Sequence, residues 1–133
     1  MIVVLVWHGP PATKKTSQVI GRRGSRAFIL PSRAYQQAAK TAIPEIATQY
    51  PHPTSLDRDD TGRLRLVNVR ARFYLGARQR PDLSGLLEAC GDLLQASGAL
   101  ANDYSIASWD GSRRFRDRDN PRTEVEITPH TED

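Results

Sequence analysis

The sequence has a single cysteine, Cys90, and no apolar run close to the ~20 residues needed to span a bilayer. A lone cysteine cannot form a disulfide within the chain, which favours an intracellular protein. The opening residues lack a basic segment and a small-residue cleavage site, so we expect no signal peptide, a cytoplasmic location and no membrane partner. With 133 residues, 38% hydrophobic and 26% charged, the composition is typical of one soluble globular domain.

Residues 1–44 contain no acidic side chain, and Glu45 is the first acidic residue of the chain. Seven basic residues precede it, namely Lys14, Lys15, Arg22, Arg23, Arg26, Arg33 and Lys40. From Glu45 onward, the chain has 15 acidic residues and 12 basic ones. The basic half suits a polyanion and the acidic half suits a cation, although chance clustering on a solvated surface explains the same charges.

Hydrophobic periodicity and turn residues predict the order of secondary structure. We expect strands over 2–7, 27–30, 65–75, 104–109 and 122–128, and helices over 33–43 and 83–97. Ser32 is the expected N-cap of the first helix, and Pro44 is expected to end or kink it. The basic segment 12–26 is interpreted as a mobile loop or loose hairpin, and the tail from about 129 as frayed. The pattern predicts a single α+β domain over 1–133, with a small mixed β-sheet packed against two main helices.

Carboxylates cluster around the second predicted helix. Asp82 stands at its start, Glu88 lies on its polar face, and Asp92 follows one turn later. Asp103 precedes the next strand and Asp110 ends it. Several oxygen ligands from neighbouring elements are what Mg²⁺ prefers, and a bound Mg²⁺ supports phosphodiester hydrolysis. The histidines, at positions 8, 52 and 130, are too scattered to predict a zinc site.

Each of these residues also has a simpler interpretation. Asp82 is equally suited to capping the helix, and Glu88 and Asp92 to being exposed helix residues. Asp103 and Asp110 stand where turns favour aspartate. Cys90 is expected in the core rather than as a nucleophile, and the two tryptophans are expected to pack rather than to stack on bases. The residues alone therefore predict a basic α+β domain, with an acidic-site nuclease as one hypothesis.

The segment around the second helix resembles the core motif of the RusA-type Holliday-junction resolvases. That motif is a basic run, Asp-Leu-Asp-Asn-Leu, a helix, a glycine, and Asp-Asp opening a strand. The matching residues here are Arg78-Gln79-Arg80-Pro81-Asp82-Leu83, a leucine-rich helix, Gly98, and Asn102-Asp103, with no gap from Asp82 to Asp103. Segments 11–17, 31–35 and 110–114 also resemble phage-borne members.

This resemblance implies a mixed α/β homodimer that uses Mg²⁺, with Mn²⁺ as an alternative ion, to make paired symmetric nicks in four-way DNA. It implies Asp82 and Asp103 as metal-binding catalytic carboxylates. The second Asp of the motif is Ser84 here, the following Asn is Gly85, and a lysine common in the family is Glu88. Because Ser84 and Glu88 share a helix face, we expect Glu88 to replace the missing Asp, with Asp110 as an outer candidate ligand.

Two further hypotheses stay open beside the endonuclease. One is a protein that binds branched DNA through a weakened or inactive metal site, and the other is a related nuclease that acts on RNA. The expected DNA-binding residues are Lys14, Lys15, Arg22, Arg23, Arg26, Arg78, Arg80, Arg113 and Arg114.

Overall fold

The computed structural model describes residues 2–12, 19–24, 26–30, 32–51, 54–78 and 80–131. Its elements in chain order are β1 (Val3–His8), β2 (Val19–Arg23), β3 (Arg26–Leu30), α1 (Arg33–Gln49), β4 (Val67–Leu75), α2 (Leu83–Ala96), the 3-10 helix η1 (Asp103–Ser105), β5 (Ile106–Ser108), β6 (Arg113–Arg116) and β7 (Arg122–Pro129). Among these residues, neither helix has both the length and the apolar character that crossing a bilayer requires.

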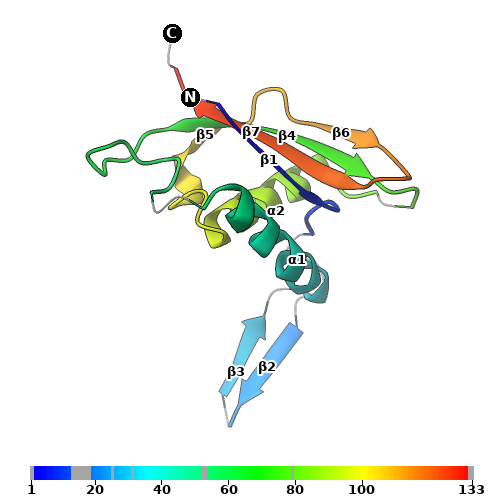
Figure 1. Ribbon diagram of the computed structural model, residues 1–133. Helices are drawn as coiled ribbons and strands as arrows, with labels where there is room; N and C mark the ends of the chain where they lie inside the picture. Colours follow the sequence, from blue (N-terminus) through cyan, green and yellow to red (C-terminus); the bar gives the residue numbers. More distant parts are fainter. Residues whose placement is uncertain are drawn as a thin grey trace.

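The main sheet has five strands in the order β1-β7-β4-β5, with β6 also paired to β4. Strand β7 is antiparallel to both β1 and β4, whereas β5 and β6 run parallel to β4. Figure 1 shows α1 and α2 packed on one face of this sheet, while the β2–β3 hairpin projects away from it beyond α1. We call the helix-covered face the inner face and the opposite one the outer face. The predicted α+β fold, with a mixed sheet and two helices, is confirmed.

Strand β4 carries the core on its inner face. Its side chains alternate between buried and half-buried along the whole strand, as the sequence predicts. The inner residues of β4 and β7 are fully or almost fully buried, namely Val67, Val69, Ala71, Phe73, Leu75, Thr123, Val125 and Ile127. Cys90 is fully buried on α2, and this burial raises the pKa of its thiol. Its predicted place in the core is confirmed.

Helix α1 begins as predicted but ends later. The Ser32 hydroxyl accepts a hydrogen bond from the Tyr35 amide at 3.1 Å, which confirms the N-cap. The helix then continues through Pro44 to Gln49, so the prediction that it ends near Ile43 is wrong. A proline inside a helix costs roughly 3 kcal/mol. The fully buried Ile46 and the contacts that the last turn makes with β1 offset this cost.

Three further differences concern strands. The strand predicted over 104–109 is shorter, because residues 103–105 form η1 and β5 covers only Ile106–Ser108. Strand β6 was not predicted, because the short run Arg-Arg-Phe-Arg has no alternation of apolar residues. Strand β7 extends into the tail that was expected to fray from about 129. Pro129 pairs in register with Val67, and the His130 amide donates to the Leu66 carbonyl at 3.0 Å. The basic segment 12–26, where it is described, contains the β2–β3 hairpin.

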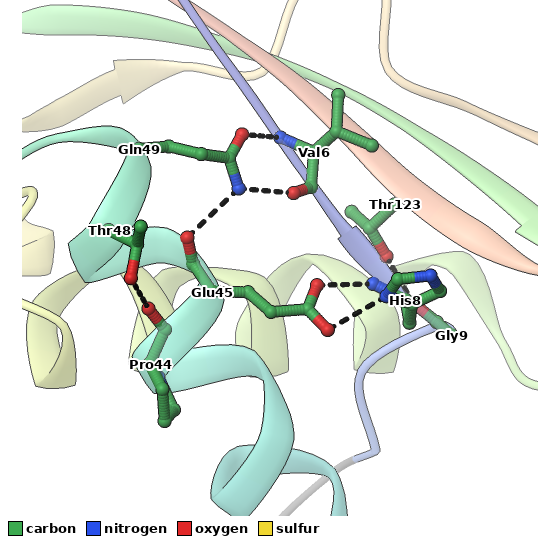
Figure 2. A network of polar contacts seen from close by, with 8 residues as sticks. All are labelled: Val6, His8, Gly9, Pro44, Glu45, Thr48, Gln49 and Thr123. Atoms are coloured by element: carbon green, nitrogen blue, oxygen red, sulfur yellow. Dashed lines mark hydrogen bonds and ion pairs between the residues drawn. The ribbon is translucent and has the colours of Figure 1, made fainter.

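The free edge of β1 is held by side chains of α1 (Figure 2). The Gln49 amide accepts a hydrogen bond from the Val6 backbone N–H at 2.8 Å and donates one to the Val6 carbonyl. One turn earlier, Glu45 accepts from the His8 backbone N–H at 2.9 Å and contacts His8 Nδ1 at 2.8 Å. These side chains therefore occupy backbone groups that an exposed edge strand would offer to another chain.

We predict that Gln49→Leu lowers the free energy of unfolding by about 1 to 2 kcal/mol, because two hydrogen bonds to the β1 backbone are lost. Urea denaturation monitored by tryptophan fluorescence measures this change. Gln37 lies on the same helix and is exposed, so Gln37→Leu is the matched control and should change stability by less than about 0.5 kcal/mol. Equal effects of the two substitutions would contradict a specific role for Gln49.

Candidate functional site

Asp82 occupies the N-cap position of α2 but does not cap it. Its backbone is extended (φ −68°, ψ 145°), and its side chain makes no capping hydrogen bond. The side chain is exposed. Next to it, Arg114 Nη1 donates to the Pro81 carbonyl at 2.9 Å, which places a guanidinium beside the start of the helix. The Asp82 carboxylate is therefore available to a ligand, and the interpretation of this residue as a simple helix cap is not supported.

Asp103 lies against the middle of α2. A Cβ built on Gly91 would stand 3.7 Å from the Asp103 Cβ, and the Asp103 amide donates to Gln95 Oε1 at 3.0 Å. This is an ordinary van der Waals distance, so the Asp103 loop packs directly over this position of the helix. The Asp103 side chain itself remains exposed.

Glu88 precedes Gly91 by three residues, and Ser84 precedes Glu88 by four, so the three positions share one face of α2. Both side chains are exposed. Asp103 therefore lies along the helix face that carries Glu88. Asp82 is farther away, because the nine residues from Asp82 to Gly91 correspond to a helix length of roughly 13 Å.

Asp92 interacts electrostatically with Tyr35 at the start of α1. The pKa of the Tyr35 hydroxyl is raised mainly by burial and further by the negative charge of Asp92. Asp92 is half-buried rather than an exposed helix residue.

Asp110 lies on the outer face of the sheet. Its amide donates to Asn68 Oδ1 at 3.0 Å. It lines a pocket of about 270 Å³ together with Asn68, Arg70, Glu126 and Thr128. These residues project from β4 and β7 away from the helices, so the structure separates Asp110 from the Asp103 loop.

Among the described residues, no three His, Cys, Asp or Glu side chains come close enough to hold a metal ion together. The structure therefore places Glu88 and Asp103 along one helix face but does not gather them with Asp82 into a three-carboxylate cluster. Mg²⁺ is commonly held by one or two carboxylates together with waters and substrate phosphates. Exposed carboxylates on one face of α2 fit this kind of site.

The expected DNA-binding residues lie in different parts of the fold. Lys14 and Lys15 lie outside the described residues, and only the backbone of Arg22 and Arg23 is described, in β2. Arg26 is exposed in β3, and Arg78 and Arg80 are exposed just before α2. Arg113 and Arg114 are consecutive in β6. Because Arg114 contacts Pro81, it lies beside the start of α2.

A residue that sequence reasoning missed holds the Asp103 loop in place. Asp57 is fully buried, and its carboxylate accepts hydrogen bonds from the amides of Ala101 and Asn102 at 2.9 and 3.2 Å and from the Ser105 hydroxyl at 2.8 Å. The sequence places Asp57 in a run of charged and turn residues, which is typical of an exposed loop. Its neighbour Leu56 is also buried, and this apolar residue is the one local sign that the segment returns to the core.

Comparison of the sequence with protein-family models and with curated proteins gave no significant match.

We predict that Asp57→Asn lowers the free energy of unfolding by about 3 kcal/mol. An asparagine of the same size loses the charge that strengthens three hydrogen bonds, and its NH₂ group faces a backbone N–H that also donates. Asp60 is in the same loop and exposed, so Asp60→Asn is the matched control and should be nearly neutral. Chemical denaturation gives the stabilities, and hydrogen exchange should show faster exchange of the 101–105 amides in Asp57→Asn alone. Unchanged exchange at 101–105 would rule out the positioning role.

Proposed function

We propose that this protein is a metal-dependent DNA endonuclease of the RusA type that acts on branched DNA such as four-way junctions. The observation that carries the proposal is the approach of Asp103 to the helix face that carries Glu88. In addition, the Asp82 carboxylate at the start of α2 makes no capping hydrogen bond. Both features fall within the segment that resembles the family motif. The resemblance also implies a homodimer, which presents two such segments to the two strands that are cut.

The proposed roles follow from the position of each side chain. Glu88 and Asp103 would contribute the oxygen ligands on the helix face. Asp82, which lies too far along the helix to bind the same ion in this conformation, would contribute its carboxylate at the helix start beside Arg114. Mg²⁺ bound there, or Mn²⁺ in its place, would neutralise charge on the phosphate oxygens and promote ionisation of a water. Asp110 is not part of this set, because it lines the pocket on the outer face.

Basic side chains beside these carboxylates support DNA as the substrate. Arg78 and Arg80 are exposed in the segment that leads into α2, and Arg114 contacts the same segment. Guanidinium groups bind phosphates with well-defined geometry and without regard to base identity. They would hold a phosphodiester close to Asp82.

The second candidate function is a protein that binds branched DNA without cutting it. The finding that favours this alternative is the absence of a three-carboxylate group in the part of the chain that is described. Incubation with a labelled four-way junction and Mg²⁺ distinguishes the two, with linear duplex as the control substrate. Paired nicks in the junction support the endonuclease, whereas binding without nicks supports the alternative.

We predict that Asp82→Asn and Asp103→Asn each reduce junction cleavage by at least about 100-fold, since substitution even of groups around metal ligands costs 10- to 100-fold. Binding measured in Ca²⁺ or without metal should be retained, because the basic residues are unchanged. Asp119→Asn, at an exposed position between β6 and β7, is the control and should cut normally. Wild-type cleavage by either variant would exclude that residue from the site.

Glu88 gives a sharper test of the departure from the family motif. If Glu88 replaces the missing second Asp, Glu88→Gln should lose about as much activity as Asp82→Asn. Ser84 lies one turn earlier on the same face, so Ser84→Asp should restore part of the activity of Glu88→Gln. Single-turnover cleavage with saturating enzyme separates this effect from binding. A silent Glu88→Gln would remove Glu88 from the proposed site.

A further inference from the structure

The outer face of the sheet brings together two arginines. Arg72 of β4 and Arg113 of β6 are direct register partners in the parallel pair, so their side chains lie on the same face. Arg72 is half-buried and Arg113 is exposed. Like charges directly opposite each other on neighbouring strands destabilise a sheet. A bound anion between them would relieve this repulsion.

Three carboxylates on this face are paired with other arginines. Glu126 is paired with Arg70, and Glu124, the register neighbour of Arg72 on β7, accepts from Arg122 Nε at 2.8 Å. Asp117 also pairs with Arg122, at 2.8 Å. Within the described ranges, no carboxylate comes within ion-pairing distance of Arg72 or Arg113. These two guanidinium groups therefore have no direct carboxylate partner among the described residues, although Glu124 lies opposite Arg72 in the sheet.

An aromatic stack adjoins the two arginines. The rings of Tyr74 and Phe115 are stacked, with centroids 5.0 Å apart and an interplanar angle of 18°. The Arg122 guanidinium lies 3.8 Å from the centroid of the Tyr74 ring. Phe115 retains 38% of its surface exposed, although it is a large apolar residue. The stack therefore fixes a partly exposed aromatic ring next to two arginines that have no ion-pair partner among the described residues.

We propose that Arg72, Arg113 and Phe115 form a binding site for single-stranded nucleic acid. Arg113 and Phe115 are two residues apart on one strand, which corresponds to roughly 6.6 Å, and both face outward. Phosphates bind to the paired arginines while a base stacks on Phe115, the combination of groups by which proteins hold single strands without sequence preference. The site lies on the sheet face opposite α2, so it is distinct from the proposed cleavage site and requires no cleavage.

A nucleic acid strand fits this surface better than an acidic peptide does. Both would satisfy the arginines, but only the strand brings a flat base for the exposed Phe115 ring. Base-on-aromatic stacking contributes a factor of roughly 5 to 150 in affinity per base. The aromatic contact therefore distinguishes the two partners experimentally.

The test measures fluorescence anisotropy of a labelled oligothymidine of roughly 12 nucleotides in EDTA, over a series of salt concentrations. A second strand of equal length lacks the bases. Replacing Arg72 and Arg113 together by Gln should reduce the salt slope by about 1.4, since each phosphate contact to a single strand contributes about 0.7. Phe115→Ala should weaken oligothymidine binding by about 5- to 150-fold and leave binding of the abasic strand unchanged.

The control variant combines Arg33→Gln with Arg63→Gln, two exposed arginines outside this face, and removes the same charge. Phe115→Leu, which keeps an apolar side chain, replaces Phe115→Ala if the latter is unfolded. Equal slopes for the arginine and control variants would overturn the proposal, as would equal losses on both strands. Displacement of the strand by a polyglutamate peptide of equal charge would instead assign the surface to an acidic protein. Because no metal is present, these outcomes do not depend on whether the protein cuts DNA.

Discussion

The alternation of side chains along β4 determines on which side of the sheet each polar group lies. Strand β4 is bonded to β7 on one side and to β5 and β6 on the other, so its pleat continues into its neighbours. Every second residue faces the helices and is buried. The others, including Arg70 and Arg72, must point outward. The Asp103 loop therefore adjoins α2 on the inner side, whereas Asp110 and the arginine pair occupy the outer side.

This constraint explains which parts of the fold were predictable from the sequence. The strands β4 and β7 and helix α2 have long, regular apolar patterns, and each was predicted within two residues of its observed ends. Strand β6 has no such pattern. It forms because its backbone pairs with β4, which is a tertiary effect that local sequence does not encode. The extension of α1 past Pro44 likewise depends on contacts with β1 that lie 43 residues away in the sequence.

The candidate site was predictable to a smaller extent. The motif named Asp82 and Asp103, helix spacing added Glu88, and the structure brings Asp103 to the helix face of Glu88. Spacing alone cannot place Asp110, because it lies in the turn after β5, where its amide donates to Asn68 Oδ1 on the outer face. Asp57 was missed for a similar reason, since its burial is decided by the return of its loop to residues 101–105.

The position of the carboxylates has a consequence for metal binding. Like charges repel, so gathering three exposed carboxylates without a cation is unfavourable. Such groups remain apart until a cation and an anionic substrate balance their charge. If the proposed site binds Mg²⁺, it would bind the ion weakly alone and more tightly when DNA phosphates complete its ligands, because the two binding events would be linked. The buried Asp57 network fixes the backbone that carries Asp103, so the exposed Asp103 side chain extends from a well-defined position.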